Sequence, residues 1–308
     1  MGIYYSIFLI IIDFVGLFGN VVFVLLTVLF KQFRKSMCAL LMGMVSLCDV
    51  VMEVAIIIIS IVSLSGHEFS QHTCFYTLSL PIFLNCVQTG LMLCISFDRL
   101  AAIVLPMWYQ NMHTNLFLFL SFVPGVVFGS IVIYTGVYYM ETDEMLPLCN
   151  VPASMNEITY TLWNKISLGM NIMLVVVYVV ACLILWRKAR EVRSDYIKTQ
   201  IIVMKTIICI AAFYVITWVL PDLLILAKQA LSLNFEVLNY APSFFAHLCF
   251  TGNFYIYIWR NQTYRDALKK LCKCDVGHRN VSSFVVSRIE SSVRKHTMTV
   301  QSTGVHGN

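Results

Sequence analysis

Charged side chains are scarce in this chain. They make up 12% of its 308 residues, whereas hydrophobic residues make up 59%. A typical soluble domain has about 25% charged residues. A soluble fold of this size would need polar groups to cover its surface, and this chain has too few of them. The composition therefore excludes an ordinary soluble domain and favours a protein whose solvent is a lipid bilayer.

Motifs of catalysis and metal binding are also missing. The sequence has no HExxH or GxSxG motif, and none of its 11 cysteines forms a C-x-x-C pair with zinc-ligand spacing. Most of the cysteines lie in apolar runs, where they behave as small buried hydrophobes. Internal repeats, which are typical of transporters, are not evident. We expect a protein that is not an enzyme and that needs no cofactor.

Long apolar runs are abundant instead. A helix needs about 20 mostly apolar residues to cross the hydrocarbon core, and seven segments meet this requirement. We expect helices because backbone groups in lipid must pair internally, and because runs such as VVFVLLTVLF do not alternate as barrel strands would. The prediction is an all-α membrane protein with a seven-transmembrane helix bundle. The expected spans are 5–30, 37–65, 74–104, 114–139, 160–186, 200–227 and 237–259.

Lysine and arginine are distributed unevenly around these spans. With the N-terminus outside, all but two of the 21 lysines and arginines lie on the inner side, and the exceptions are Lys165 and Lys228. The positive-inside rule therefore predicts a multi-pass membrane protein with an outer N-terminus and a cytoplasmic C-terminus. Basic residues gathered at membrane edges suit membrane lipids as partners and do not suit a nucleic acid.

A short amphipathic segment follows the seventh span. In YRDALKKLCKC, Tyr264 and two leucines share one face, and basic residues crowd the other. This pattern predicts a short eighth helix in the inner interface. Cys272 and Cys274 at its end are either acylated or simply exposed thiols. We assign residues 1–273 to the membrane domain and expect the polar residues 274–308 to form a disordered cytoplasmic tail.

Three polar side chains lie deep in predicted spans. Asn20 is in the first span, Asp49 in the second and Asn253 in the seventh. Ionisable groups at membrane depth are costly and usually functional. Because their depths are compatible, the three side chains can form one polar network. That network either binds a sodium ion near Asp49 or only joins the helices by hydrogen bonds.

A second set of polar side chains lies in the outer or middle parts of the spans. We expect some of them to line an outward pocket, and Asp222 with His247 is the favoured pair because the sixth and seventh helices are neighbours in a bundle. A histidine beside an acid can change charge near neutral pH. The alternative for each residue is an interhelical hydrogen bond without a ligand. The set also contains Asn85, Glu53 and Asp13.

Two further features belong to the third and sixth spans. Asp98 and Arg99 end the third span on its inner side, where Arg99 either bonds an acid and later a partner, or only extends toward water. Pro221 breaks a backbone hydrogen bond in the sixth span and bends it, which makes this helix a candidate moving part. Trp218 lies three residues earlier on the same side, and we include it among the pocket candidates.

Two cysteines fall outside the membrane in the predicted orientation. Cys74 opens the third span, and Cys149 lies in the second outer loop. Both face an oxidising compartment, where a disulfide persists. We therefore expect Cys74 and Cys149 to form a disulfide bond.

Taken together, these features resemble the rhodopsin-like G-protein-coupled receptors over residues 7–273. Six motifs occur in order, at the spacing of that family, on seven predicted spans. The stretch NFYIYIWRNQTYRDAL is most similar to the nematode serpentine chemoreceptors of class SX. The matching motifs are Gly19-Asn20, Asp49, Cys74 placed 25 residues before Arg99, DRLAAIVLPMWY at 98–109 for DRYxAIxxPxxY, NFYIY at 253–257 for NPxxY, and Tyr264 in the eighth helix.

The sequence departs from the family at informative positions. Trp218-Val219-Leu220-Pro221 places one more residue between the tryptophan and the proline than the family's WxP, which puts the usual switching role of Trp218 in question. Pro81 stands where receptors for amines carry an acid, so an amine is not an expected ligand.

The resemblance implies a receptor that binds an extracellular ligand among helices 3, 5, 6 and 7 and activates a heterotrimeric G protein. For activation and coupling it implies Asp98, Arg99, Tyr178, Asn253 and Tyr257. The leading hypothesis is a chemosensory receptor. A neuropeptide receptor of the same fold is the alternative, because the outer segment ETDEMLPLCN is acidic. A ligand-gated channel or a transporter is the more distant alternative.

Overall fold

Helices dominate the structure, which is a computed structural model. Two strands of two residues each are the only β-structure in the part of the chain that it describes. The prediction of an all-α protein is therefore confirmed. The described residues are 2–140, 144–146, 149–191, 201, 204–205, 208–209, 211–221, 223 and 237–272.

Five helices within these ranges are long and apolar enough to cross a membrane. They coincide with the first five predicted spans. They are α1 (Gly2–Leu29), α3 (Met37–Leu64), α4 (Gln71–Val104), α6 (Thr114–Tyr138) and α8 (Glu157–Glu191). The short helices between them are α2 (Lys31–Arg34), α5 (Pro106–Gln110) and α7 (Val151–Ser154).

The last two predicted spans are described to different extents. In the segment 200–227, the residues that the structure describes are helical and include a π-helical turn, η1 (Val215–Val219). The seventh span is α11 (Val237–Arg260). Its length of about 36 Å at 1.5 Å per residue exceeds the hydrocarbon core of about 30 Å.

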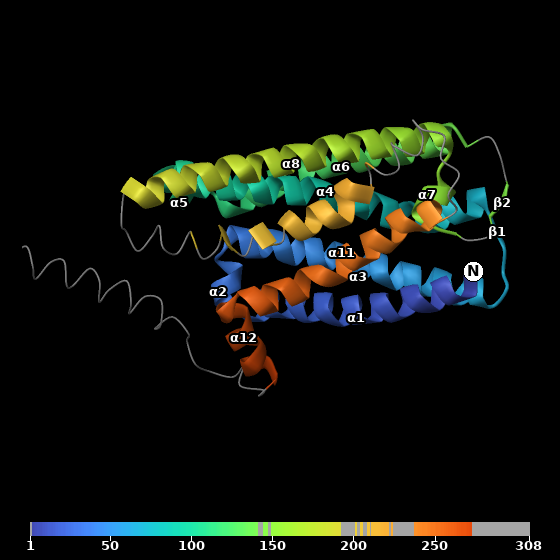
Figure 1. The fold of residues 1–308 in the computed structure, drawn as a ribbon, viewed down its shortest axis with the longest axis horizontal. Coiled ribbons are helices and arrows are strands. Elements are labelled where there is room, and N and C mark those ends of the chain that lie inside the picture. The colour runs from blue at the N-terminus through green and yellow to red at the C-terminus, as the bar shows by residue number, and fades with distance from the viewer. Residues whose placement is uncertain are drawn as a thin grey trace, which may run out of the picture. The chain divides into compact units, whose positions relative to one another are not determined.

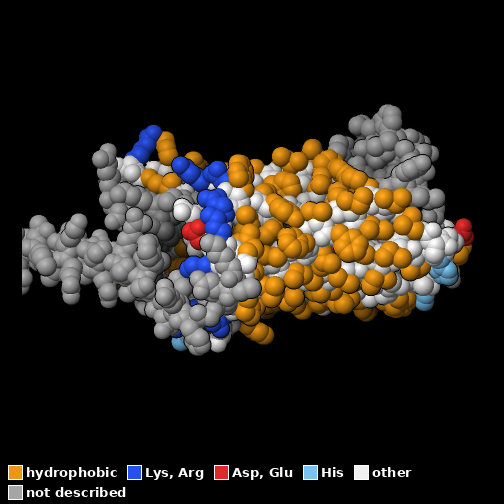
Figure 2. Space-filling view, turned by 90° about the horizontal axis from the view of Figure 1, so that it is seen from below, with side chains coloured by type: hydrophobic (Ala, Val, Ile, Leu, Met, Phe, Trp, Pro, Cys, Tyr) orange, Lys and Arg blue, Asp and Glu red, His pale blue; other side chains and the backbone are white. Residues whose placement is uncertain are grey.

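The long helices lie side by side in one bundle (Figure 1). α1 packs against α3 and α11, whereas α4 packs against α3, α6 and α8. Large apolar side chains face outward: Phe18 is 66%, Phe119 70% and Tyr134 67% exposed. Figure 2 shows such side chains covering the flank of the molecule. This surface suits lipid and not water.

α4 and α6 approach each other closely because glycines face each other between them. A Cβ added to Gly125 would lie 2.6 Å from the Cα of Val87, and one added to Gly90 would lie 2.6 Å from the Cα of Gly125. Small residues at helix contacts let backbones meet and are typical of membrane helices. The pair fixes α4 firmly against α6.

One end of the bundle is closed by a short loop structure. Strand β1 (Phe69–Ser70) pairs antiparallel with β2 (Met145–Leu146). Cys74 and Cys149 form a disulfide with Cα atoms 5.6 Å apart, which confirms the predicted bond. We call this the disulfide end, and we call the opposite end of α4, at Asp98 and Arg99, the arginine end.

By their contacts, the described residues up to 265 form one unit and those from 266 to 272 belong to another. Helix α12 (Gln262–Cys272) begins in the first unit and continues into the second, with Lys269 and Lys270 in its last turn and Cys272 exposed. The predicted eighth helix is thus present as a helix, and its placement in an interface stays a prediction. Cys274 and the predicted tail lie outside the described residues.

Candidate functional site

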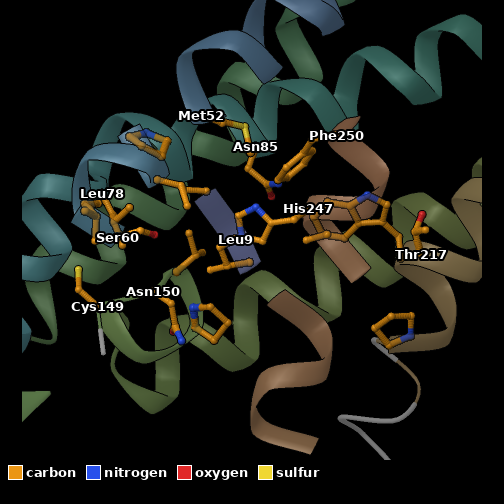
Figure 3. Close-up of a pocket in the computed structure, with 18 of the residues that line it drawn as sticks. Leu9, Met52, Ser60, Leu78, Asn85, Cys149, Asn150, Thr217, His247 and Phe250 are labelled. Atoms are coloured by element: carbon orange, nitrogen blue, oxygen red, sulfur yellow. The ribbon is translucent and has the colours of Figure 1, made fainter. Parts of the chain in front are cut away.

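A cavity of about 70 Å³ lies at the disulfide end of the bundle, between residues of α1, α3, α4, α7, α8, η1 and α11 (Figure 3). Cys149 and Asn150 line it, so the disulfide that joins Cys149 to α4 also positions one wall. Most lining side chains are apolar, for example Leu9 and Met52. The cavity therefore reaches α1 and α3, beyond the helices 3, 5, 6 and 7 that the family resemblance implies.

The predicted pocket residues are mostly brought together. Asn85, Trp218 and His247 all line the cavity, from α4, η1 and α11 respectively. Asp222 lies outside the described residues, so its predicted pairing with His247 stays a prediction. Figure 3 shows Asn85 and His247 converging on the same space.

His247 has a partner that the sequence analysis did not favour. Its Nδ1 lies 2.7 Å from Oδ1 of Asp13 in α1, and both side chains are buried. A comparison of the depths of these residues in the first and seventh helices could have found this pair. Asp13 precedes Asn20 by seven residues and His247 precedes Asn253 by six, so the two side chains lie at similar depth in helices that run in parallel.

A buried polar core lies between the cavity and the arginine end. Nδ2 of Asn20 donates to Oε1 of Glu53 at 3.0 Å and to the carbonyl oxygen of Phe250 at 3.1 Å. Nε2 of Gln88 donates to Oδ1 of Asp49 at 2.8 Å. Asn20, Asp49 and Glu53 have no exposed surface. The cluster links α1, α3, α4 and α11 through hydrogen bonds that lipid cannot replace.

The connections of this core differ from the predicted ones. Asn20 bonds Glu53 and not Asp49, and Glu53 lies one helical turn from Asp49 on α3. Asn253 interacts with the Asp49 carboxylate, yet neither side-chain atom of its amide makes a hydrogen bond of ordinary length and angle. Gln88 was overlooked by the sequence analysis, although a glutamine in the middle of an apolar span is itself a signal.

The core has more oxygen atoms than partners for them. Oδ2 of Asp49, Oε2 of Glu53 and Oδ1 of Asn20 are buried without a hydrogen bond. Among the described residues, no lysine or arginine pairs with either acid, and no cluster of three or more His, Cys, Asp or Glu side chains is close enough to hold a metal ion.

At the arginine end, Arg99 is held by its neighbour. Its Nε donates to Oδ2 of Asp98 at 2.8 Å, and its Nη2 donates to the phenol oxygen of Tyr109 at 3.1 Å. The Tyr109 hydroxyl in turn donates to Oδ1 of Asp98 at 2.7 Å. Burial raises the pKa of Tyr109 well above its usual range, so the phenol keeps its proton and donates. Asp98 has no exposed surface and Arg99 is 8% exposed.

Two further tyrosines surround this ion pair. Tyr178 of α8 and Tyr257 of α11 are buried and lie within electrostatic reach of Arg99. The Tyr257 ring also meets Phe23 edge-on at 5.3 Å and Tyr264 at 5.4 Å between ring centroids. The structure thus gathers the residues predicted for coupling around Arg99, with Asn253 one helical turn before Tyr257.

The π turn η1 accounts for the unusual spacing in Trp218-Val219-Leu220-Pro221. The backbone N–H of Leu220 bonds the carbonyl oxygen of Val215, five residues earlier. A π turn contains one residue more than an α turn, so it takes up the extra residue before Pro221. Trp218 stays buried as a result and packs against Tyr214 and Phe250, with ring centroids 6.3 and 5.9 Å apart.

A helical membrane bundle with a loop-covered cavity at one end and a paired aspartate and arginine at the other is the architecture of a seven-transmembrane receptor. The family model "Serpentine type 7TM GPCR chemoreceptor Srsx" matches residues 13–272, and the chain belongs to this family. The predicted class and the resemblance to class SX are confirmed, and with them the seven-helix fold. No curated protein matches the chain significantly.

Proposed function

We propose that the chain is a chemosensory receptor of the plasma membrane that binds an extracellular ligand in the cavity and activates a heterotrimeric G protein at the arginine end. One observation carries the proposal. The cavity and the Asp98–Arg99–Tyr109 cluster lie at opposite ends of one bundle, and the buried polar core lies between them. A signal could pass along this line of contacts.

The distribution of charge supports the orientation that this function needs. Lys31, Arg34 and Lys35 lie beside the arginine end, in the turn between α1 and α3. The disulfide lies at the other end, as an outer, oxidising compartment requires. The proposed orientation therefore places the N-terminus outside and the arginine end in the cytoplasm.

The ligand must bind the active arrangement more tightly than the resting one. Trp218 of η1 and His247 of α11 line the cavity. Farther along α11, Asn253 and Tyr257 lie toward the arginine end. We propose that ligand binding shifts them, that Arg99 leaves Asp98, and that an inner cleft opens near Tyr178 and Tyr257. Lys188 donates to the carbonyl oxygen of Ile103 at 2.7 Å and marks the rim of this cleft.

Two sites suggest how the receptor could be regulated, one by a bound cation and one by acylation. The unpaired oxygens around Asp49 and Glu53 suit a hard cation such as sodium, which would stabilise the resting arrangement. Cys272 is exposed at the end of α12 and available for acylation. Both are proposals about regulation and neither is needed for the receptor function itself.

The cavity favours a small ligand over a peptide. Its volume is about 70 Å³, and most of its described lining is apolar, which suits a small molecule. The acidic segment 141–150 that motivated the neuropeptide hypothesis lies largely outside the described residues. A channel or transporter has no comparable support.

The test is expression in cells with a promiscuous G protein and a broad ligand panel. Arg99→Ala should abolish the response while surface expression persists. Lys165→Ala is the control, because Lys165 is exposed near the start of α8 and lies away from the arginine end. An intact response in Arg99→Ala, or a ligand-evoked current that persists without any G protein, would overturn the proposal.

A further inference from the structure

The cavity also restricts the chemistry of its ligand. We infer that it binds a small uncharged molecule, mostly apolar, with one hydroxyl or carbonyl group that Asn85 and His247 hold. This inference rests on the proposed function, since it assigns a ligand class to the same cavity. It follows from the size, the charge and the unpaired polar atoms of the described lining residues.

Size gives the first limit. The cavity volume of about 70 Å³ is the space open to the centres of water-sized groups, and it admits a compact molecule. A short-chain alcohol or ketone fits this space.

Charge gives the second limit. Among the described side chains that line the cavity, His247 is the only ionisable one, because Cys149 is disulfide-bonded. Nδ1 of His247 already lies 2.7 Å from Oδ1 of Asp13. Pro81 also lines the cavity and offers no charge. An ammonium or carboxylate ligand would lose its water here without gaining a counter-ion, which disfavours it strongly.

Unpaired polar atoms supply the anchor. Oδ1 of Asn85 is buried, lines the cavity and makes no hydrogen bond. Since Asp13 occupies Nδ1 of His247, the other ring nitrogen is the one that the imidazole can offer to a ligand. A hydroxyl both donates and accepts, so it can satisfy the amide of Asn85 in either orientation. Figure 3 shows both side chains directed toward the same space.

Apolar contacts complete the site. Leu9, Met52 and Phe250 lie around the polar pair and can cover a short alkyl chain. The hydroxyl of Ser60 borders the same cavity from α3. Burial of the alkyl chain then supplies most of the binding, and the single polar group sets its orientation.

The test measures binding to the purified full chain in lipid nanodiscs, without any G protein. The probes have nearly the same size and differ in charge: 1-pentanol, 2-pentanone, pentylamine and pentanoate. We expect ligand-dependent thermal stabilisation with the alcohol or the ketone and none with the amine or the carboxylate. Asn85→Leu should weaken that binding about tenfold, as expected for one lost hydrogen bond.

Two further variants make the test specific. Ser60→Phe should abolish the stabilisation by filling the cavity, and Asn115→Leu should leave it unchanged, because Asn115 is exposed at the start of α6. Stabilisation by pentylamine or pentanoate alone, equal stabilisation of the Ser60→Phe variant, or no stabilisation by either neutral probe would overturn the inference. Specific binding of a neutral probe that activates no G protein in cells would instead refute the proposed function and leave this ligand assignment standing.

Discussion

The carboxylate of Asp13 and the imidazole of His247 meet inside the bundle, with Oδ1 and Nδ1 2.7 Å apart. The two residues are 234 positions apart in the sequence, and they join α1, the first spanning helix, to α11, the last. The pair closes the bundle on the side where the chain begins and ends its passage through the membrane, and His247 of this pair also lines the cavity.

Removal of one partner of this pair should destabilise the fold. Asp13→Leu leaves a buried imidazole without its partner, which costs about 1–3 kcal/mol of the free energy of unfolding. The double variant Asp13→Leu/His247→Leu should lose less than the sum of the two single variants, because it leaves no orphaned polar group. Thermal unfolding of the purified protein in detergent measures the cycle. Strictly additive losses would show that the two side chains do not interact.

Gly125 should not tolerate a methyl group. The added Cβ of Gly125→Ala would lie 2.6 Å from the Cα of Val87, and two backbones cannot move apart without loss of packing between α4 and α6. We expect a loss of about 1–3 kcal/mol in stability, with reduced surface expression.

Gly169 offers a matched control for this substitution. It lies in α8, and nothing is within 4 Å of a Cβ added there. Gly169→Ala should be neutral or stabilise the helix by up to about 1 kcal/mol, because alanine has the higher helix propensity. Similar effects of the two variants on unfolding temperature would contradict the close approach of α4 and α6.

Tyr109→Phe should raise basal signalling. The variant removes the hydroxyl that donates to Asp98 and accepts from Arg99, so the resting ion pair loses two contacts. A loss of about 1 kcal/mol would shift the equilibrium toward the active state about fivefold. The measurement is ligand-free G-protein activation, normalised to surface expression. Tyr134→Phe on the exposed face of α6 is the control, and unchanged basal activity in Tyr109→Phe would refute this role of the phenol.

Deletion of Val219 should be tolerated. The π turn would revert to an α turn, and Trp218 would keep its place against Phe250 because the surplus residue is gone. Deletion of Ile172 from α8 is the control, since it rotates the rest of a regular helix by about 100°. Ligand response and surface expression should survive the first deletion and not the second. Equal loss in both would mean that the π turn itself is required.

Much of the architecture could be predicted from the sequence. Long apolar runs bounded by lysine and arginine mark helices that cross a bilayer, because backbone groups in hydrocarbon must pair internally and these runs do not alternate as barrel strands would. The disulfide followed from the compartment that Cys74 and Cys149 share. The cavity residues Asn85 and His247 were found because polar groups in apolar helices need a reason to be there.

The pairing of these groups could not be predicted in the same way. Whether Asn20 reaches Asp49 or Glu53, one turn apart on the same face of α3, depends on how α1 and α3 are shifted and tilted against each other. The π turn at Val215–Val219 depends on one shifted backbone hydrogen bond, which side-chain patterns do not reveal. Such contacts are set by packing between helices and only the structure gives them.

α4 begins near the disulfide and ends beside the ion pair. Cys74 and Arg99 are 25 residues apart in this one helix, which places them about 37 Å apart along its axis. The loop that carries Cys149 and the Asp98–Arg99 pair are therefore attached to the two ends of a single helix. Reduction of the disulfide would free the loop at one end of the helix whose other end carries Asp98 and Arg99.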